Sequence, residues 1–145
     1  MKYTMTILVL LAFGNLQAQI WQDSYPRALE LAREGERSLM LVFSGSDWCA
    51  PCIHMKRKIL DSPEFMAYAA ENFVLYNADF PKKKQNQLTE ELTSMNRSLA
   101  EKYNPKGFFP LIVVLDKKGA VLGETGFYPR YGPKKYIELF NNFIQ

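Results

Sequence analysis

Cys49 and Cys52 are the only two cysteines of this 145-residue chain, and they stand three positions apart. Residues i and i+3 of a helix lie on one face, within the Cα separation that a disulfide tolerates, so the two sulfurs can pair without moving the backbone. Closing so short a loop contributes about 2 kcal/mol in the chain-entropy model, against about 3 kcal/mol for a fifteen-residue loop. The spacing therefore favours a bridge that opens and recloses easily over a structural staple.

The two sulfurs are predicted to differ in reactivity. A cysteine at a helix N-terminus meets unpaired N–H groups and the positive end of the helix dipole, which lower its pKa and populate the attacking thiolate. Cys49 is therefore the predicted nucleophile. Cys52, one turn inside the helix, is predicted to be less exposed and to resolve a mixed disulfide by displacing Cys49 from it. Pro51 fits the first turn, where its missing N–H has no partner to lose.

A metal site is the alternative use of such a pair. A structural zinc ion needs four ligands, and the chain offers no third cysteine and a single histidine, His54. At about 100° per residue, His54 lies roughly 140° around the helix from Cys49 and is predicted to face solvent. A c-type haem would need histidine directly after Cys52, where Ile53 stands. We expect no metal and no bound cofactor; a copper or zinc carrier remains the less favoured alternative.

Composition limits the class of protein. The chain has 18 Lys+Arg against 15 Asp+Glu, with 48% hydrophobic residues, eight glycines and eight prolines. These values are typical of one globular domain with a packed core. No long basic stripe alternates with aromatic residues, so a nucleic-acid partner is not indicated.

The first residues have the order of a secretory signal. Lys2 is followed by an uncharged apolar run over residues 7–13 and then by the small residue Ala18. The run is far shorter than the ~20 residues of a spanning helix, so we expect no stable membrane span after signal removal. The predicted domains are a signal peptide over 1–18 and a folded domain over 19–145. Export to a bacterial periplasm is predicted, since the C-terminus carries no endoplasmic-reticulum retrieval signal; an amphipathic N-terminal segment is the alternative.

Hydrophobic periodicity predicts one domain in which strands and helices alternate after an opening helix. A helix is capped at Asp23 or Ser24, and a later one restarts with Ser62 as cap and Pro63 as its first residue. The predicted helices are 23–37, 49–60, 62–69, 88–103 and 136–143, and the predicted strands are 39–43, 73–78, 110–115 and 120–125. This order predicts a sheet that is mostly parallel, covered by helices, with an antiparallel hairpin at its C-terminal end.

Two motifs connect this pattern to a known family. Trp48-Cys49-Ala50-Pro51-Cys52 opens a helix after a buried strand, and Gly107-Phe108-Phe109-Pro110 opens a later strand. With them, nearly all of residues 20–145 resemble the thioredoxin superfamily. The chain looks most like its exported members, in which the active-site helix is followed by an Asp/Ser-Pro-Glu break, here residues 61–64. The resemblance implies an α/β thioredoxin-like fold with a central mixed sheet flanked by helices. It also implies thiol-disulfide exchange with cysteine-containing exported proteins and with a redox partner protein.

The resemblance also implies a substrate groove beside the cysteines. Phe109–Pro110 would be a cis peptide, and the backbone of Phe109 would pair with an extended substrate segment. An X-Pro bond loses only about 0.5–1 kcal/mol in the cis form, and a proline that begins a strand leaves nearby backbone groups free for such pairing. Trp48 and Pro51 would complete the groove. A trans proline at a strand edge is the alternative, and the aromatic residues of loop 127–131 either widen the groove or pack into the core.

Three positions depart from the family pattern. Val42 stands where thioredoxins keep a buried acid that accepts the proton of the resolving cysteine, so Cys52 must find another base or react slowly. Arg57 replaces a helix-kinking proline, which predicts a straighter helix. The approach to Trp48 is one residue longer and brings Asp47 close to Cys49. Asp47 is predicted to offset the helix dipole and keep the pKa of Cys49 from falling far, with a solvated helix cap as the alternative.

The sequence therefore predicts a thiol-disulfide oxidoreductase in which Cys49 attacks and Cys52 resolves. The main alternative is a non-catalytic, chaperone-like module that holds extended polypeptide in the same groove while its cysteines stay locked. The run Lys82-Lys83-Lys84 is predicted to be a solvated loop.

Overall fold

The computed structural model describes residues 21–145. The predicted signal peptide lies outside the described residues, so its boundary after Ala18 stays a prediction. Within residues 21–145, no helix combines the length and the apolar character that crossing a membrane requires.

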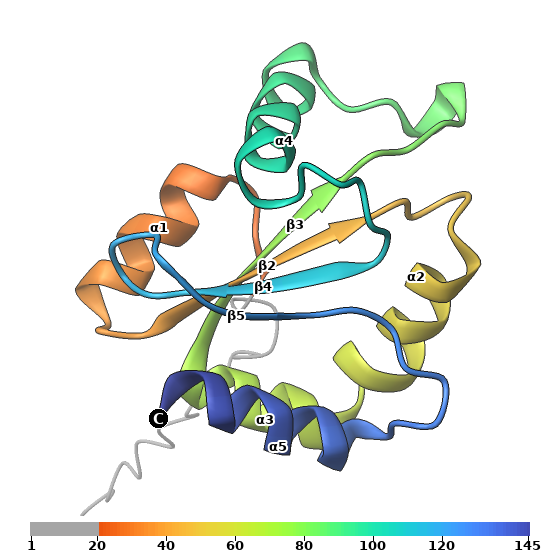
Figure 1. Cartoon of the computed structure of the whole chain (residues 1–145). Helices are drawn as coiled ribbons and strands as arrows, with labels where there is room; N and C mark the ends of the chain where they lie inside the picture. The colour runs from red at the N-terminus through yellow and green to blue at the C-terminus, as the bar shows by residue number, and fades with distance from the viewer. Residues whose placement is uncertain (1–20) are drawn as a thin grey trace, which may run out of the picture.

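Five strands form one sheet in the spatial order β1-β3-β2-β4-β5 (Figure 1). They are β1 (Trp21–Gln22), β2 (Ser38–Ser44), β3 (Phe73–Asp79), β4 (Leu111–Leu115) and β5 (Val121–Thr125). β3 runs parallel to β1 and β2, whereas β4 runs antiparallel to β2 and β5. The predicted mixed sheet with a C-terminal hairpin is confirmed. The prediction that the sheet is mostly parallel is wrong, because β4 pairs antiparallel with β2 as well as with β5. This follows because the connection from β3 leaves and re-enters the sheet at the same end.

Helices cover both faces of this sheet (Figure 1). One face packs against α1 (Tyr25–Glu34) and α4 (Glu90–Tyr103), and the other against α2 (Ala50–Met55), α3 (Pro63–Asn72) and α5 (Pro133–Ile144). A 3-10 turn, η3 (Lys84–Asn86), precedes α4. Side chains of the central strands alternate between the two layers: Met40 and Val42 face the α3 and α5 side, while Leu39 and Leu41 face α1 and α4.

Capping explains where three helices begin. The hydroxyls of Ser24, Ser62 and Thr89 accept the amides of residues three positions on, at 3.4, 3.2 and 3.3 Å. Pro63 occupies the first turn of α3, where no intrahelical N–H partner is lost. The predicted starts at Ser24 and Ser62 are therefore confirmed.

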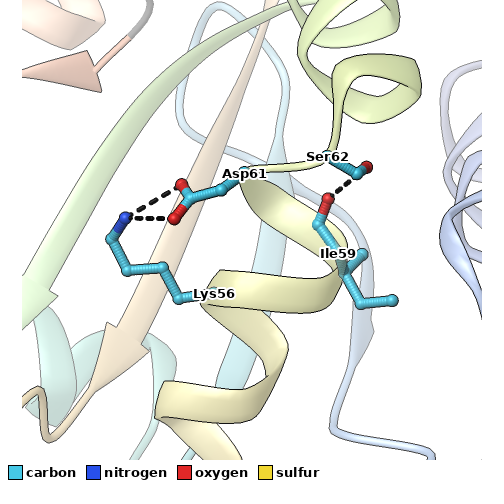
Figure 2. Close-up of polar contacts among 4 residues, drawn as sticks. All are labelled: Lys56, Ile59, Asp61 and Ser62. Atoms are coloured by element: carbon cyan, nitrogen blue, oxygen red, sulfur yellow. Dashed lines mark hydrogen bonds and ion pairs between the residues drawn. The ribbon is translucent and has the colours of Figure 1, made fainter.

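The active-site helix does not run straight on after α2. It continues as a π-helical turn, η2 (Lys56–Leu60), in which the amide of Asp61 donates to the carbonyl of Lys56 at 2.8 Å. The Ser62 hydroxyl closes the turn by donating to the Ile59 carbonyl at 2.6 Å (Figure 2). The straighter helix predicted from Arg57 is wrong, because the wider i→i+5 turn interrupts the α-helix even without a proline.

Candidate active site

The two cysteines form a disulfide at the start of α2, after the turn that follows β2. Their Cα atoms lie 5.2 Å apart. The carbonyl of Gly45 accepts the amides of Trp48 and Cys49, at 3.2 and 2.9 Å, and so shapes the turn that leads into the helix. Cys49 is the N-cap of α2, and its sulfur accepts the amide of Cys52 at 3.3 Å. The helix therefore already directs an N–H group at the sulfur that was predicted to carry negative charge.

Burial does not separate the two sulfurs in this oxidised state. Cys49 is 4% exposed and Cys52 is 5% exposed. The prediction that Cys52 is the less exposed of the pair is wrong here, because the bond holds both cysteines in the same covered position. What distinguishes them is the helix: Cys49 caps it and Cys52 lies inside its first turn.

Trp48 stands beside the disulfide and is held by its surroundings. Its indole N–H donates to the carbonyl of Phe80 at 2.7 Å, yet the residue remains 39% exposed. Its ring meets the edge of Phe109 at 5.6 Å between centroids, and Phe109 meets Phe80 in the same way at 5.5 Å. Three aromatic rings thus form a fixed, partly exposed apolar wall.

The Phe109–Pro110 peptide bond is cis, which confirms the expectation drawn from the family. Phe108, which the sequence analysis did not place in the site, is 57% exposed next to it. Its backbone is fixed by the buried side chain of Asn104, which donates to the Phe108 carbonyl at 2.8 Å and accepts the Phe108 amide at 2.9 Å. The Asn-Pro pair at 104–105 was the available signal for such a turn.

Asp47 anchors a loop instead of capping the helix. Its carboxylate accepts the backbone amides of Lys82 and Lys83, both at 2.9 Å, and the side-chain amide of Asn86 at 3.0 Å. The hydrogen bond from the Lys82 amide, supported by Asn86 and Lys83, holds the pKa of Asp47 below its usual value. Because Cys49 is the N-cap, the alternative of an Asp47 cap is wrong. Its effect on the Cys49 pKa stays a prediction.

The lysine run is a solvated loop as predicted, with Lys82, Lys83 and Lys84 all exposed, and one of the three also contacts the site. The ammonium group of Lys82 lies over the Trp48 ring, 4.0 Å from its centroid. Loop 80–87 is therefore tied to the site at both Asp47 and Trp48. These contacts join residues more than thirty positions apart, which sequence reasoning did not connect.

A cavity of about 640 Å³ borders the other side of the pair, and Cys52, Pro110 and Val42 are among the residues that line it. Val42 points into this layer, as its family position implies. Polar groups gather nearby on the ends of β2 and β3: the Ser44 hydroxyl donates to the Asn77 side chain at 2.8 Å, and the Ser46 amide donates to the Asp79 carboxylate at 2.9 Å.

The remaining predicted features lie farther along α2. Pro51 is exposed in its first turn. His54 is exposed as predicted, and its ring meets Phe127 at 5.2 Å between centroids. In the loop before α5, Phe127 and Tyr131 pack against the core, whereas Tyr128 is 47% exposed.

Among residues 21–145, no three side chains of His, Cys, Asp or Glu gather as a metal site would need.

Comparison with known proteins agrees with this geometry. A family model described as thioredoxin-like matches residues 20–117. The chain is 38% identical over 122 residues to "Disulfide bond reductase DsbH" of Chlamydia pneumoniae, covering 84% of this chain and 69% of that protein. It is also 30% identical to "Thioredoxin-related protein DsbJ" of the same organism, over 71% of this chain but only 31% of that protein.

Solved structures show the same fold. One titled "DsbH Oxidoreductase" superposes with a TM-score of 0.79 at 35% identity, covering 86% of this chain and 83% of that one. A thioredoxin from Thermus thermophilus superposes with a TM-score of 0.62 at 20% identity, covering 86% of this chain and 85% of that one. With the disulfide at the start of α2 and the cis proline at the start of β4, the chain belongs to the thioredoxin-like family and is a thiol-disulfide oxidoreductase.

Proposed function

We propose that the protein is an exported reductase that opens disulfides of other proteins, with Cys49 attacking and Cys52 resolving. The observation that carries the proposal is the position of Cys49: its sulfur caps α2 and accepts the Cys52 amide at 3.3 Å. A thiolate in that position is stabilised by the helix N-terminus. The reductive direction is supported by the name of the chlamydial relative, a disulfide bond reductase.

The reaction has two exchange steps. The Cys49 thiolate attacks one sulfur of the substrate disulfide, a mixed disulfide forms, and the other substrate sulfur leaves as a thiolate that takes a proton from water. The Cys52 thiolate then attacks the Cys49 sulfur and expels the second substrate thiolate. Two electrons pass to the substrate, and the protein is left with the Cys49–Cys52 bond seen in the structure. A redox partner protein must return these electrons before the next cycle.

The proposed substrate groove consists of Trp48, Pro51, Phe109 and Pro110. Trp48 and Pro51 supply exposed surface near the start of α2, and the cis Phe109–Pro110 bond, whose Phe109 ring contacts Trp48, lies directly before β4. To these the structure adds Phe108, whose exposed ring extends the apolar surface. An extended polypeptide fits such a site, because backbone pairing gives affinity while the apolar rings contact its side chains.

Reduction of insulin by dithiothreitol, catalysed by the full chain, tests this function. We expect wild type to accelerate the reaction, Cys49→Ser to abolish the acceleration, and Cys52→Ser to stop after forming a mixed disulfide that mass spectrometry detects on Cys49. Equal rates for all three proteins would leave only polypeptide binding in the groove. A stable mixed disulfide in Cys49→Ser instead of Cys52→Ser would reverse the two roles.

Export is proposed from residues 1–18, with cysteine-containing periplasmic proteins as substrates. Expression of the full chain in a bacterium, followed by fractionation and N-terminal sequencing, tests it. We expect periplasmic protein that begins at Gln19. Full-length protein retained in the cytoplasm would contradict the signal peptide, while leaving the chemistry at Cys49 unaffected.

A further inference from the structure

The cavity beside the disulfide adjoins one cysteine of the pair and not the other. Its volume of about 640 Å³ lies in the range of small-molecule sites. Cys52 is among the residues that line it, whereas Cys49 is not. A nucleophile that enters this space therefore comes next to the inner residue of the pair, within the layer of α3 and α5, whereas the Phe109 ring packs against the other layer. Resolution of a protein mixed disulfide does not need such a space.

Two features of the chain leave the cavity open. Val42 presents a small apolar side chain to it, and the π-helical turn η2 carries the chain around its edge. Because that turn closes i→i+5, it brings Lys56 and Asp61 side by side, where the Lys56 ammonium binds both carboxylate oxygens at 2.9 and 2.7 Å (Figure 2). Both residues line the cavity and both are partly exposed, so the ion pair lies at its solvent side.

The charged residues of the cavity wall leave a positive excess. Lys56, Arg57 and Asp61 carry two positive charges and one negative charge. Asp61 neutralises Lys56, and Arg57 forms no ion pair with any residue in the range 21–145. The Asp79 carboxylate, which is bound to Ser46, places a negative charge next to the cavity at the ends of β2 and β3. It is therefore beside Arg57 that a carboxylate or sulfonate group is favoured over a cationic one of the same size.

The chemistry of the disulfide favours attack at the same sulfur. In thiol-disulfide exchange, the thiol with the lower pKa is the better leaving group. Attack on Cys52 expels Cys49, whose sulfur already accepts the Cys52 amide at 3.3 Å at the start of the helix. Attack on Cys49 would instead expel Cys52, which lies inside the helix without that capping position.

We propose that the cavity is an entry site through which small anionic thiols reduce the protein by attacking Cys52. The inference rests on the oxidoreductase chemistry of the pair. It makes small thiols a second class of electron donor for this protein, beside the redox partner protein. In the first step a thiolate bonds to the Cys52 sulfur, the Cys49–Cys52 bond breaks, and Cys49 leaves as a thiolate. A second thiolate attacks the small-molecule sulfur of that adduct, releases a small disulfide, and leaves Cys52 reduced and free to take a proton from water.

Single-cysteine variants test access to the cavity. Cys49→Ser keeps only Cys52, which is reacted with two methanethiosulfonate reagents of similar size, one ending in a sulfonate and one in a trimethylammonium group. Each rate is divided by the rate of a free thiol in the same buffer. We expect the sulfonate reagent to be favoured at Cys52, and Arg57→Glu to lower the preference at least about fivefold. One pair of unit charges roughly 4 Å apart in water changes a rate by about fivefold, and the substitution changes the charge by two units.

Lys58→Glu in the same background is the matched control. It makes the same change of charge at the next residue, which is exposed and does not line this cavity. Equal effects of Arg57→Glu and Lys58→Glu would overturn the proposal, and so would a Cys52 that neither reagent modifies.

The oxidised wild-type protein tests the reduction itself. At equal thiolate concentrations, 2-mercaptoethanesulfonate is expected to reduce it faster than 2-mercaptoethylamine, with Arg57→Glu removing the difference. Equal rates for the two thiols would overturn the entry site. The insulin assay separates this failure from a failure of the proposed function, because it reports attack by Cys49 on a protein disulfide.

Discussion

On the side of Trp48 the disulfide is bordered by side chains held in place, whereas on the side of Val42 it borders open space. Trp48 is fixed by the Phe80 carbonyl and by the edge of Phe109. Loop 80–87, next to Trp48, is fixed by the three hydrogen bonds that Asp47 accepts. The opposite side has a cavity of about 640 Å³ edged by a single exposed ion pair.

Under the two proposals above, one reactive bond meets two kinds of reactant. A polypeptide loses conformational freedom when it binds, and a groove whose walls are already ordered adds little further loss. A small thiol needs only a path to the sulfur. The ordered side is therefore suited to protein substrates and the open side to small ones, and substitutions on each side should change different activities.

Gly45→Ala is expected to have the largest effect on the ordered side. A Cβ at this position would overlap the indole ring of Trp48, so the ring must move and lose its bond to the Phe80 carbonyl. Overpacking of this kind destabilises a protein by about 1–3 kcal/mol. We expect insulin reduction to fall several-fold while reaction of Cys52 with small reagents persists, as measured by the two assays above and by urea denaturation.

Gly132→Ala is the control for this change. A Cβ there meets no atom within 4 Å, and Gly132 lies at the start of α5 with φ of −91°. Gly132→Ala is expected to keep the wild-type rates of insulin reduction and of Cys52 modification, with a small loss of stability because alanine is a poorer N-cap than glycine. An unchanged rate of insulin reduction in Gly45→Ala would show that the fixed position of Trp48 is not needed for protein substrates.

Asn104→Leu is expected to have the next largest effect on stability and on insulin reduction. It removes both hydrogen bonds that fix the Phe108 backbone and leaves a partly buried N–H and C=O without their partner. Such a loss destabilises a protein by about 1–3 kcal/mol. Urea denaturation should show this loss, and the Michaelis constant for insulin should rise because Phe108 is no longer held. Asn142→Leu, the same change at an exposed position of α5, should alter neither.

Local signals were enough to predict the part of the site that is built from neighbouring residues. The Cys49/Cys52 spacing predicted that the two sulfurs can pair, the helix start predicted that Cys49 lies at its N-terminus, and Ser62-Pro63 predicted the start of α3. The cis bond at Pro110 was expected from the family resemblance. Each of these features depends on geometry within a few residues or on a motif, so it can be predicted from the local sequence.

The rest depends on contacts that no local pattern encodes. Asp47 meets backbone amides of Lys82 and Lys83, thirty-five and thirty-six positions away, and its own surroundings in the sequence do not indicate them. The π turn at Lys56–Leu60 arises where α2 must end against the Asp61-Ser62 break, and the cavity is a space between elements. Equal burial of the two cysteines follows from packing around the closed bond.

Acid should release loop 80–87 from Asp47, with a smaller effect on stability than the substitutions at Gly45 and Asn104. Hydrogen bonds to the carboxylate lower its pKa from the model-compound value of 3.8, so the anchor stabilises the fold fully above that value and is lost as the pH falls through the lower, folded-state pKa. The amide shifts of Lys82 and Lys83 in NMR spectra should titrate with a midpoint below 3.8. A midpoint at or above that value would contradict the anchor.

Asp116 supplies an internal reference for this titration. Asp116 lies in the turn that follows β4, and its carboxylate accepts the amides of Ala120 and Lys118. These hydrogen bonds likewise lower the pKa of Asp116. In Asp47→Asn the shifts of Lys82 and Lys83 should lose their acid transition, while those of Lys118 and Ala120 keep theirs. Loss of both transitions would indicate general acid unfolding in place of a local release.

The smallest expected effect concerns the Cys49 thiolate in reduced Asp47→Asn. Removal of a negative charge near the start of α2 should lower the pKa of Cys49, which ultraviolet titration of thiolate absorbance measures. The change should stay below about one unit, because water screens an exposed charge and the carboxylate is bound to the loop amides. An unchanged or higher pKa would reject the tuning role and leave Asp47 as an anchor alone. Since a more stable thiolate makes the disulfide more oxidising, a lower pKa would mean that Asp47 keeps the pair a better reductant.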